Sequence, residues 1–352
     1  MISESYQVPE ISIFIGGTGR SGTTLMRKIL GRHRDIAAFG EAQLVNDVIY
    51  RQFPTWIAEC PGRRREFLLR AYRRLCLTRF YRCRATWRVN KPFIRIWNRC
   101  NLFWIARFQD SESAFWRNPV VLLIERAWLS NRVQERTLSL RLPGATQAQV
   151  ELGYRGLYPF MSRDAIEQSF GILDALKDVT SIEESHRICG RFWSAVFASH
   201  ARRNDKKLWA EKSPLNALYV SFLDRCFSGL RFINVIRDGR DVACSNVEYA
   251  WGAQDVKSAL DLWAQQLASS LTEQRKLPPD HCMNVRYEDL VLDTAQTVRH
   301  ITDFLGVPFD DAMLSQPVHR QPLGRHRSVW NEDLEEYARS RHAPLLREWG
   351  YL

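Results

Sequence analysis

The stretch from Ile11 to Thr24 restricts the fold more than any other part of the chain. The apolar segment Ile11–Ile15 predicts a buried strand, and the glycine-rich segment Gly17–Thr24 follows it directly, with Thr23 opening a helical pattern. Glycines let the backbone wrap around an anion, and the N–H groups at a helix N-terminus point toward it. The sequence therefore predicts an α/β fold with a phosphate-binding loop.

This loop departs from the pattern of proteins that bind nucleoside triphosphates. The spacing from Gly17 to Gly22 satisfies the first part of that pattern, G-x-x-x-x-G, but Thr23-Thr24 replaces the Lys-Ser/Thr that should follow. A cation instead appears earlier, at Arg20. We expect the loop to bind phosphate, although not in the way a kinase or an ATPase does.

The rest of the chain alternates strand and helix patterns on either side of a long interruption. Strands are predicted at 11–15, 208–210, 230–236 and 281–286, each followed by a helical pattern. This alternation predicts a central, mainly parallel sheet with flanking helices. The alternation is lost between 46 and 185. We therefore expect one domain, 1–352, with a large helical insertion at 46–185 that is rich in Arg and Trp and covers the acceptor side of the site.

The charge of the chain indicates anionic ligands. The formal net charge is +11, and residues 63–117 hold fourteen arginines and one lysine against three acids, with twelve aromatic residues between them. This composition suits an acidic acceptor or a peripheral contact with an anionic membrane, and it also occurs in proteins that bind single-stranded nucleic acids. The alternative is a set of amphipathic helices whose arginines are solvated. We expect no specific nucleic-acid partner and leave the oligomeric state open.

Targeting signals and cysteines give weaker constraints. The sequence has no apolar run of about 18 residues and no signal-peptide pattern at its start, so a cytoplasmic protein is expected. Its eight cysteines lack C-x-x-C spacing, which predicts free thiols and no metal site.

A second strand-to-helix junction lies at 235–245. Arg237 is expected at the carboxyl end of the strand, where open α/β sheets bind ligands. If a helix begins near Asp238 or Gly239, Ser245 falls within its first two turns. Arg237 and Ser245 would then bind one phosphate together. The alternative is a turn in which the charges at 237–241 only pair with each other.

Five segments in a fixed order carry a family resemblance. They are GTGRSGTTLM at 17–26, EKSP at 211–214, VIRDGRD at 235–241, VRYEDLV at 285–291 and GRHRSVW at 324–330. With these segments the chain resembles the sulfotransferases that use 3′-phosphoadenosine 5′-phosphosulfate (PAPS), and among them the branch of tyrosylprotein and many bacterial sulfotransferases. The resemblance covers the first 45 residues and most of 205–335, and it implies a P-loop NTPase-like sulfotransferase fold.

The resemblance implies a set of donor-binding residues. The first loop would bind the 5′-phosphosulfate, Arg237 and Ser245 the 3′-phosphate, and the basic C-terminal segment would close over that phosphate. The residues expected to bind PAPS are Thr18, Gly19, Arg20, Ser21, Gly22, Thr23, Thr24, Arg237, Ser245, Tyr287, Arg325 and Arg327. No metal is expected, since PAPS has no β- or γ-phosphate to be gripped.

Three residues are expected to carry the chemistry. Arg20 would neutralise the leaving oxygen, Lys212 would supply a second cation, and Glu41 would take the proton of the acceptor. The alternatives are that Arg20 is a solvated turn residue, that Lys212 pairs with Glu211 at the surface, and that Glu41 only neutralises Arg20. The relatives carry two consecutive acids at this point, whereas Ala42 follows Glu41 here. Tyr287 has the alternative of being a core aromatic residue.

The resemblance thus implies in-line transfer of a sulfuryl group from PAPS to the hydroxyl of an acceptor, which is a tyrosine, a glycan, a lipid or a small metabolite. Two other classes of function stay open. One is a P-loop kinase or NTPase, which Thr23 in place of lysine disfavours. The other is a non-catalytic protein whose basic insertion binds nucleic acid or membrane.

Overall fold

The structure is a computed structural model, and it describes residues 11–42, 44–45, 48–60, 65–66, 68–70, 72–73, 76, 163–248, 253–319 and 323–352. The chain divides into two compact units, one made of Met1–Arg51 and Cys189–Leu352 and the other of Gln52–Ile188. Most of the predicted insertion at 46–185, including most of the basic run at 63–117, lies outside the described residues. Its role as a cover for the acceptor stays a prediction.

The described strands of the first unit form one parallel sheet. Its order is β2-β3-β1-β4-β5. The strands are β1 Ser12–Gly17, β2 Ile36–Gly40, β3 Leu208–Lys212, β4 Leu230–Ile236 and β5 Cys282–Arg286. Every residue of β1 is buried, as expected for a strand covered by helices on both faces. The prediction of a mainly parallel sheet is confirmed.

The strand order creates a place for a ligand at one edge of the sheet. The chain adds β2 and β3 on one side of β1 and then crosses to add β4 and β5 on the other side. In open α/β sheets, a ligand binds beyond the carboxyl ends of the strands where the order reverses in this way. The reversal lies between β1 and β4, which pair up to Gly17 and Val235. Both predicted anion-binding junctions therefore begin at the same edge.

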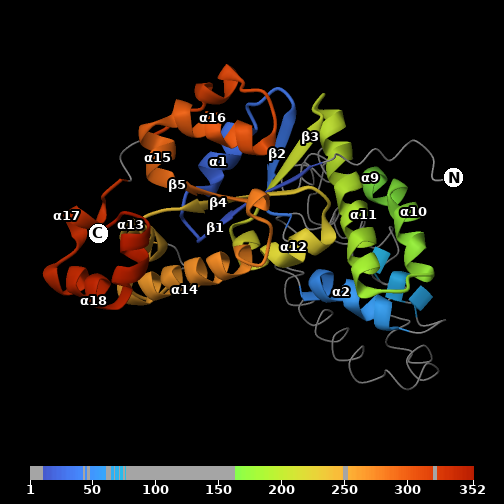
Figure 1. Cartoon of the computed structure of the whole chain (residues 1–352), viewed down its shortest axis with the longest axis horizontal. Coiled ribbons are helices and arrows are strands. Elements are labelled where there is room, and N and C mark those ends of the chain that lie inside the picture. Colours follow the sequence, from blue (N-terminus) through green and yellow to red (C-terminus); the bar gives the residue numbers. More distant parts are fainter. Residues whose placement is uncertain are drawn as a thin grey trace, which may run out of the picture. The chain divides into compact units, whose positions relative to one another are not determined.

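Helices cover both faces of this sheet. In Figure 1, α1, α15 and α16 lie on one face, and α12 and α14 lie on the other. The first group packs apolar side chains such as Met26 and Ile301 against the sheet. The α-helices of this unit are α1 Thr23–Leu30, α12 Val220–Cys226, α13 Gly239–Asn246, α14 Val256–Gln274, α15 Tyr287–Leu292, α16 Thr294–Leu305, α17 His326–Val329 and α18 Glu332–Glu348. Short 3-10 turns are η2 Pro214–Leu218, η3 Pro279–His281 and η4 Asp311–Ser315.

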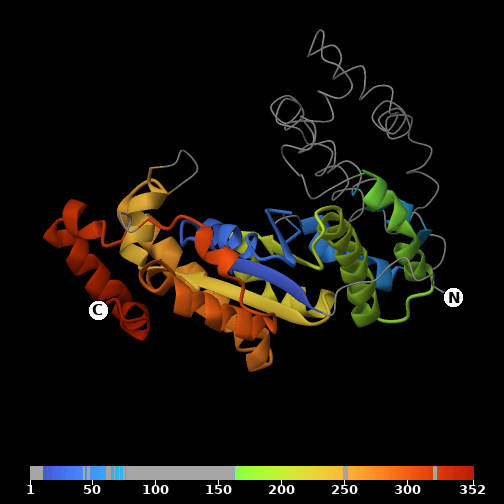
Figure 2. The same ribbon diagram turned by 90° about the horizontal axis from the view of Figure 1, so that it is seen from above.

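The last two helices lie beside α13 and α14, as the turned view in Figure 2 shows. Helix α18 continues to Glu348 with Pro344 inside it. A proline within a helix removes one N–H donor and usually ends or kinks the helix. Here burial of Ala338, His342 and Leu346 on one face offsets that cost.

The second unit is helical where the structure describes it. Helix α2 spans Val48–Glu59 and α11 spans Ile182–Arg203, so both run across the division between the units. Within the second unit lie α9 Arg163–Gln168, α10 Phe170–Leu173 and η1 Asp174–Lys177. Two arginines of the basic run have structural partners here. Arg65 donates to the carbonyls of Lys177 and Val179, both at 2.9 Å, and Arg73 donates to the carbonyl of Phe170.

Two further properties concern only the described part of the chain. None of its helices is both long and apolar enough to cross a bilayer. Six of the cysteines lie within it: Cys60, Cys76, Cys189, Cys226, Cys244 and Cys282.

Candidate functional site

The loop between β1 and α1 presents donors that suit an anion. Helix α1 begins at Thr23 behind Gly22, which has no side chain to cap the first N–H groups, and the first turn contains no acid. The side-chain oxygens of Thr18 and Ser21 are buried and have no hydrogen-bond partner within the described residues. A buried hydroxyl without a partner costs free energy, and an anionic oxygen would supply the missing acceptor. The loop therefore fits a phosphate or phosphosulfate group.

Gly22 gives this loop its shape. Its φ is 100°, in the left-handed region that favours glycine, and a Cβ at this position would lie 2.2 Å from Cδ2 of Tyr287. Tyr287 is buried, which raises the pKa of its hydroxyl. The sequence leaves a core role and a cofactor contact open for this tyrosine. The structure places it in the core, directly against the loop.

Arg237 follows β4 at the same edge of the sheet. It is buried, and its Nη1 donates to the carbonyl of Arg20 at 3.3 Å. Its Nη2 lies 3.6 Å from Oδ2 of Asp241, and its guanidinium lies over the Tyr287 ring at 4.8 Å. The predicted position at the strand end is confirmed. A buried cation is thereby held between the first loop and the second junction.

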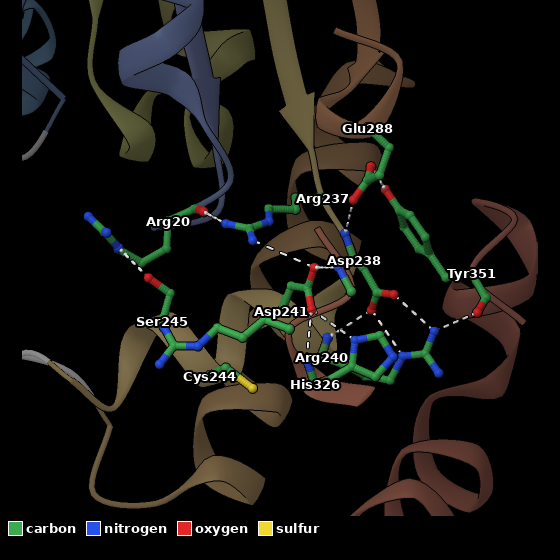
Figure 3. A network of polar contacts seen from close by, with 12 residues as sticks. Arg20, Arg237, Asp238, Arg240, Asp241, Cys244, Ser245, Glu288, His326 and Tyr351 are labelled. Atoms are coloured by element: carbon green, nitrogen blue, oxygen red, sulfur yellow. Dashed lines mark hydrogen bonds and ion pairs between the residues drawn. The ribbon is translucent and has the colours of Figure 1, made fainter. Parts of the chain in front are cut away.

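Ser245 joins the two junctions directly. It is the seventh residue of α13, within the two turns that the sequence predicts, and its Oγ accepts from Nε of Arg20 at 3.0 Å. Figure 3 shows Arg20, Arg237 and Ser245 meeting from the two strand-to-helix junctions. Arg20 is therefore not a simple solvated turn residue, although it is exposed. The two anion-binding elements expected from the sequence form one continuous site.

Asp241 is a buried acid beneath this site. Its carboxylate accepts from Nδ1 of His326 at 2.8 Å and from the backbone N–H of Gly324 at 2.7 Å. Burial alone would raise its pKa, but these hydrogen bonds and the charge of Arg237 together lower the pKa below its usual value. An ionised Asp241 therefore anchors the segment 323–330 to α13.

The alternative of an internally paired turn is partly correct. Asp238 caps α13 by accepting from the N–H of Arg240, and its carboxylate also pairs with the Arg240 guanidinium at 2.9 Å. Arg240 donates in addition to the carbonyl of Tyr351, whose hydroxyl donates to Glu288. Asp238 and Arg240 thus stabilise the junction by pairing with each other. Arg237 is the cation of this junction that faces the first loop (Figure 3).

The C-terminal segment supplies two arginines that differ in their surroundings. Arg325 pairs with Glu248, just beyond α13, and the Glu248 carboxylate also experiences the charge of Arg20. Arg327 is exposed one residue beyond the buried His326. Trp330 donates from Nε1 to Sγ of Cys244 at 3.0 Å. Of the two arginines, Arg325 is the one placed beside Arg20 and α13.

Lys212 and Glu41 form the third part of the site. Lys212 ends β3, Glu41 follows β2, and Lys212 Nζ donates to Glu41 Oε1 at 2.8 Å. The lysine side chain is buried, whereas half of the glutamate side chain is exposed. The alternative that Lys212 pairs with Glu211 at the surface is wrong, because Glu211 is fully buried and accepts from Ala42 and Asn216. Glu41 therefore pairs with Lys212. The alternative stated from the sequence is that Glu41 neutralises Arg20.

Several residues of the site are not apparent from the sequence. Asp241 lies within the predicted junction, but its bond to His326, 85 residues away, has no signal in the sequence. Glu211 lies within the EKSP segment, which marks it as notable without showing that it is buried. Across the described ranges, no group of three or more His, Cys, Asp and Glu side chains is arranged to hold a metal ion.

A comparison with protein families assigns the chain to a family. A profile described as "Sulfotransferase family" matches residues 12–83 and 127–311, which include both junctions and the Lys212–Glu41 pair. The chain belongs to the sulfotransferase family. It has a transferase fold of this family, with a parallel central sheet and flanking helices.

The curated relatives cover only part of this sulfotransferase. It is 33% identical over 128 residues to a putative protein-tyrosine sulfotransferase of Caenorhabditis elegans, a match that covers 35% of this chain and 48% of the relative. It is 29% identical over 108 residues to the protein-tyrosine sulfotransferase of Drosophila melanogaster, which covers 29% of this chain and 22% of that one. The chain thus matches about half or less of the length of these relatives.

Solved structures give a more distant likeness. The sulfotransferase domain from the curacin biosynthetic pathway aligns with a TM-score of 0.45 and 15% identity, over 94% of this chain and 96% of that domain. The sulfotransferase domain of the Synechococcus PCC 7002 olefin synthase aligns with a TM-score of 0.41 and 16% identity, over 94% of this chain and 86% of that chain.

Proposed function

We propose that this sulfotransferase moves a sulfuryl group from PAPS to the hydroxyl of an acceptor. The observation that carries the proposal is the contact of Arg20 with Ser245, which joins a backbone anion loop to a second cation-bearing junction. A donor with phosphate groups at both its 5′ and its 3′ end needs two such elements at one edge of a sheet. The family assignment favours a transferase over a kinase or a non-catalytic binding protein.

The residues present suit such a donor. Thr18 and Ser21 carry buried hydroxyls that lack acceptors, and Gly19 is open, since a Cβ there would meet nothing within 4 Å. We assign the 5′ end of PAPS to this loop, through the N–H groups that begin α1. We assign the 3′-phosphate to Arg237 and Ser245, with Arg325 closing over it.

When bound, PAPS supplies the sulfuryl group, and the chain supplies charge and a base. We assign to Glu41 the removal of the acceptor proton as the acceptor oxygen bonds to sulfur. The S–O bond to the 5′-phosphate breaks in the same displacement, and the negative charge passes to the phosphate oxygen. We assign the neutralisation of this charge to Arg20 and Lys212. No metal is required in this proposal.

The donor assignment is tested by calorimetry with the spent donor, 3′-phosphoadenosine 5′-phosphate (PAP). We expect binding by the unaltered protein and a loss of roughly tenfold or more in Arg237→Ala, because a charge-assisted bond contributes about 1.5–3 kcal/mol. Arg231→Ala is the control. It removes an arginine from the far end of the same strand, where it pairs with Asp280.

Failure of the unaltered protein to bind PAP, or equal binding by Arg237→Ala, would overturn the assignment of the donor. The acceptor is tested separately with labelled PAPS and a peptide containing tyrosine among acids, since the curated relatives carry the name protein-tyrosine sulfotransferase. Label on a glycan, lipid or small phenol instead would keep the transferase and change the acceptor.

A further inference from the structure

Glu211 is a buried acid for which the proposed chemistry has no use. It is the fourth residue of β3, directly before Lys212, and its side chain is fully buried. Oε1 accepts from the backbone N–H of Ala42 at 2.8 Å, and Oε2 accepts from Nδ2 of Asn216 at 2.6 Å. Burying a carboxyl group is costly unless its oxygens are hydrogen-bonded, so both partners are essential to keeping it there.

These bonds connect the carboxyl ends of three neighbouring strands. Ala42 follows β2, and Glu211 lies in β3. Asn216 also donates to the carbonyl of Ile15 in β1, at 3.1 Å. Asn216 is itself buried. The side chains of Glu211 and Asn216 therefore tie together the strand ends from which the loop, Lys212 and Glu41 emerge.

Glu41 adopts a backbone conformation that needs such support. Its φ is 49°, in the left-handed region, where a residue other than glycine is strained. Two successive N–H groups hold this turn to β3. The N–H of Glu41 donates to the carbonyl of Lys212 at 2.6 Å, and the N–H of Ala42 donates to Glu211. The turn directs the Glu41 carboxylate to Lys212 Nζ.

We propose that Glu211 is a positioning residue, whose buried carboxyl group fixes the left-handed turn at Glu41 and so sets the base against Lys212. This inference rests on the proposed function for the role of Glu41. Glu211 touches neither donor nor acceptor in it, and acts only through the turn.

The pKa of Glu211 reflects its buried position. Burial raises its pKa to about 7, against the opposing effect of its bonds to Asn216 and Ala42 and of the charge of Lys212, while the charge of Glu41 raises it further. Lys212 and Glu41 are the charged groups that act on it. A folded-state pKa above the unfolded value stabilises the protein at low pH, and this stabilisation is lost as the pH rises through about 7.

The first test compares turnover in Glu211→Gln and Glu211→Ala. The amide oxygen of glutamine still accepts from Ala42, but its NH₂ group cannot accept from Asn216, whereas alanine leaves the Ala42 N–H unbonded. We expect kcat to fall roughly tenfold in Glu211→Gln and roughly a hundredfold in Glu211→Ala, since displacement of a catalytic group by about 1 Å costs about 10²-fold. The affinity for PAP should change less than about twofold in both variants.

The assay measures transfer of label from PAPS to the acceptor that the labelling experiment identifies, because this is the direction in which Glu41 takes up the acceptor proton. Glu273→Gln is the matched control. It makes the same chemical change in an acid that accepts from Ser221, outside the site. Equal kcat in Glu211→Gln, Glu273→Gln and the unaltered protein would overturn the inference.

A second test does not depend on turnover. Glycine tolerates a φ of 49°, so Glu41→Gly relieves the strain that Glu211 opposes. We expect Glu211→Ala to lower the Tm less in the Glu41→Gly background than in the unaltered protein. Equal Tm losses in the two backgrounds would contradict a role through this turn. Failure to bind PAP would refute the proposed function alone, since this thermal comparison would still decide the structural role of Glu211.

Discussion

The β1–α1 and β4–α13 junctions have the same strand–turn–helix plan, but the two helix N-termini differ in what they offer a ligand. At β1–α1 the helix begins behind a left-handed glycine, without a capping side chain and without an acid in its first turn. At β4–α13 the helix begins behind Asp238, whose carboxylate already accepts from the N–H of Arg240. The first helix has no acid of its own on its N-terminal donors, whereas the second has already bonded one of them to its own acid.

This difference indicates how each junction can bind a phosphate. The first relies on the backbone and on the partial positive charge of the helix N-terminus. The second must rely on side chains, which are Arg237 before the helix and Ser245 at its second turn. The first junction should therefore be sensitive to changes in backbone shape, and the second to changes in charge.

The largest expected effect is that of Gly22→Ala. A methyl group would overlap the buried ring of Tyr287, and the backbone would be strained at a φ of 100°. We expect a loss of about 3–5 kcal/mol in the free energy of unfolding. Urea unfolding measures it. Gly19→Ala, where a Cβ meets nothing within 4 Å, should stay within about 0.5 kcal/mol of the original protein. Similar losses at both glycines would refute a shape-specific loop.

The next effect is that of Asp238→Ala at the second junction. It removes the cap of α13 and leaves the buried Arg240 with Glu335 and the Tyr351 carbonyl as partners. We expect a loss of about 2–3 kcal/mol in stability. Asp255→Ala, at the exposed cap of α14, should cost distinctly less. The affinity of the folded protein for PAP should stay within about threefold, and clearly tighter binding would show that the N–H groups freed at this junction also reach the ligand.

The smallest expected effect is a gain in the affinity for PAP. Glu248→Gln releases Arg325 from its ion pair, so the arginine no longer has to leave a partner to meet the 3′-phosphate. We expect PAP to bind roughly two- to fivefold more tightly, because exposed ion pairs are weak. Calorimetry at low salt measures the change. Glu332→Gln, an exposed acid at the start of α18, should leave the affinity unchanged. Weaker binding in Glu248→Gln would indicate that the acid orders Arg325 for the ligand.

The sequence predicts the parts of the fold that have a strong local signal. Strands β1, β3, β4 and β5 are predicted from apolar runs at junctions with helical patterns. Strand β2, Ile36–Gly40, is missed because its five residues include two alanines and carry little intrinsic preference for a strand. It forms because its main chain pairs with β3 along its whole length. That pairing is a tertiary effect.

In the candidate site, too, the residues with a strong local signal are predicted and those that depend on tertiary contacts are not. The loop and Arg237 are evident from their positions after apolar strands. The bond of Glu41 to Lys212 joins residues 171 positions apart, and the bond of Asp241 to His326 joins residues 85 positions apart. Neither distance can be deduced from local pattern. The burial of Glu211 likewise depends on hydrogen bonds that join the ends of three strands. These strands come from separate segments of the sequence.

The close packing of Gly22 against Tyr287 has a consequence for how this family varies. Gly22 precedes α1 and Tyr287 begins α15, yet there is no room for a Cβ at the first while the second is aromatic. A homologue that replaces the glycine should therefore also carry a smaller residue at the tyrosine position. A change at the glycine first would force a clash with the ring, so the tyrosine position should change before the glycine position.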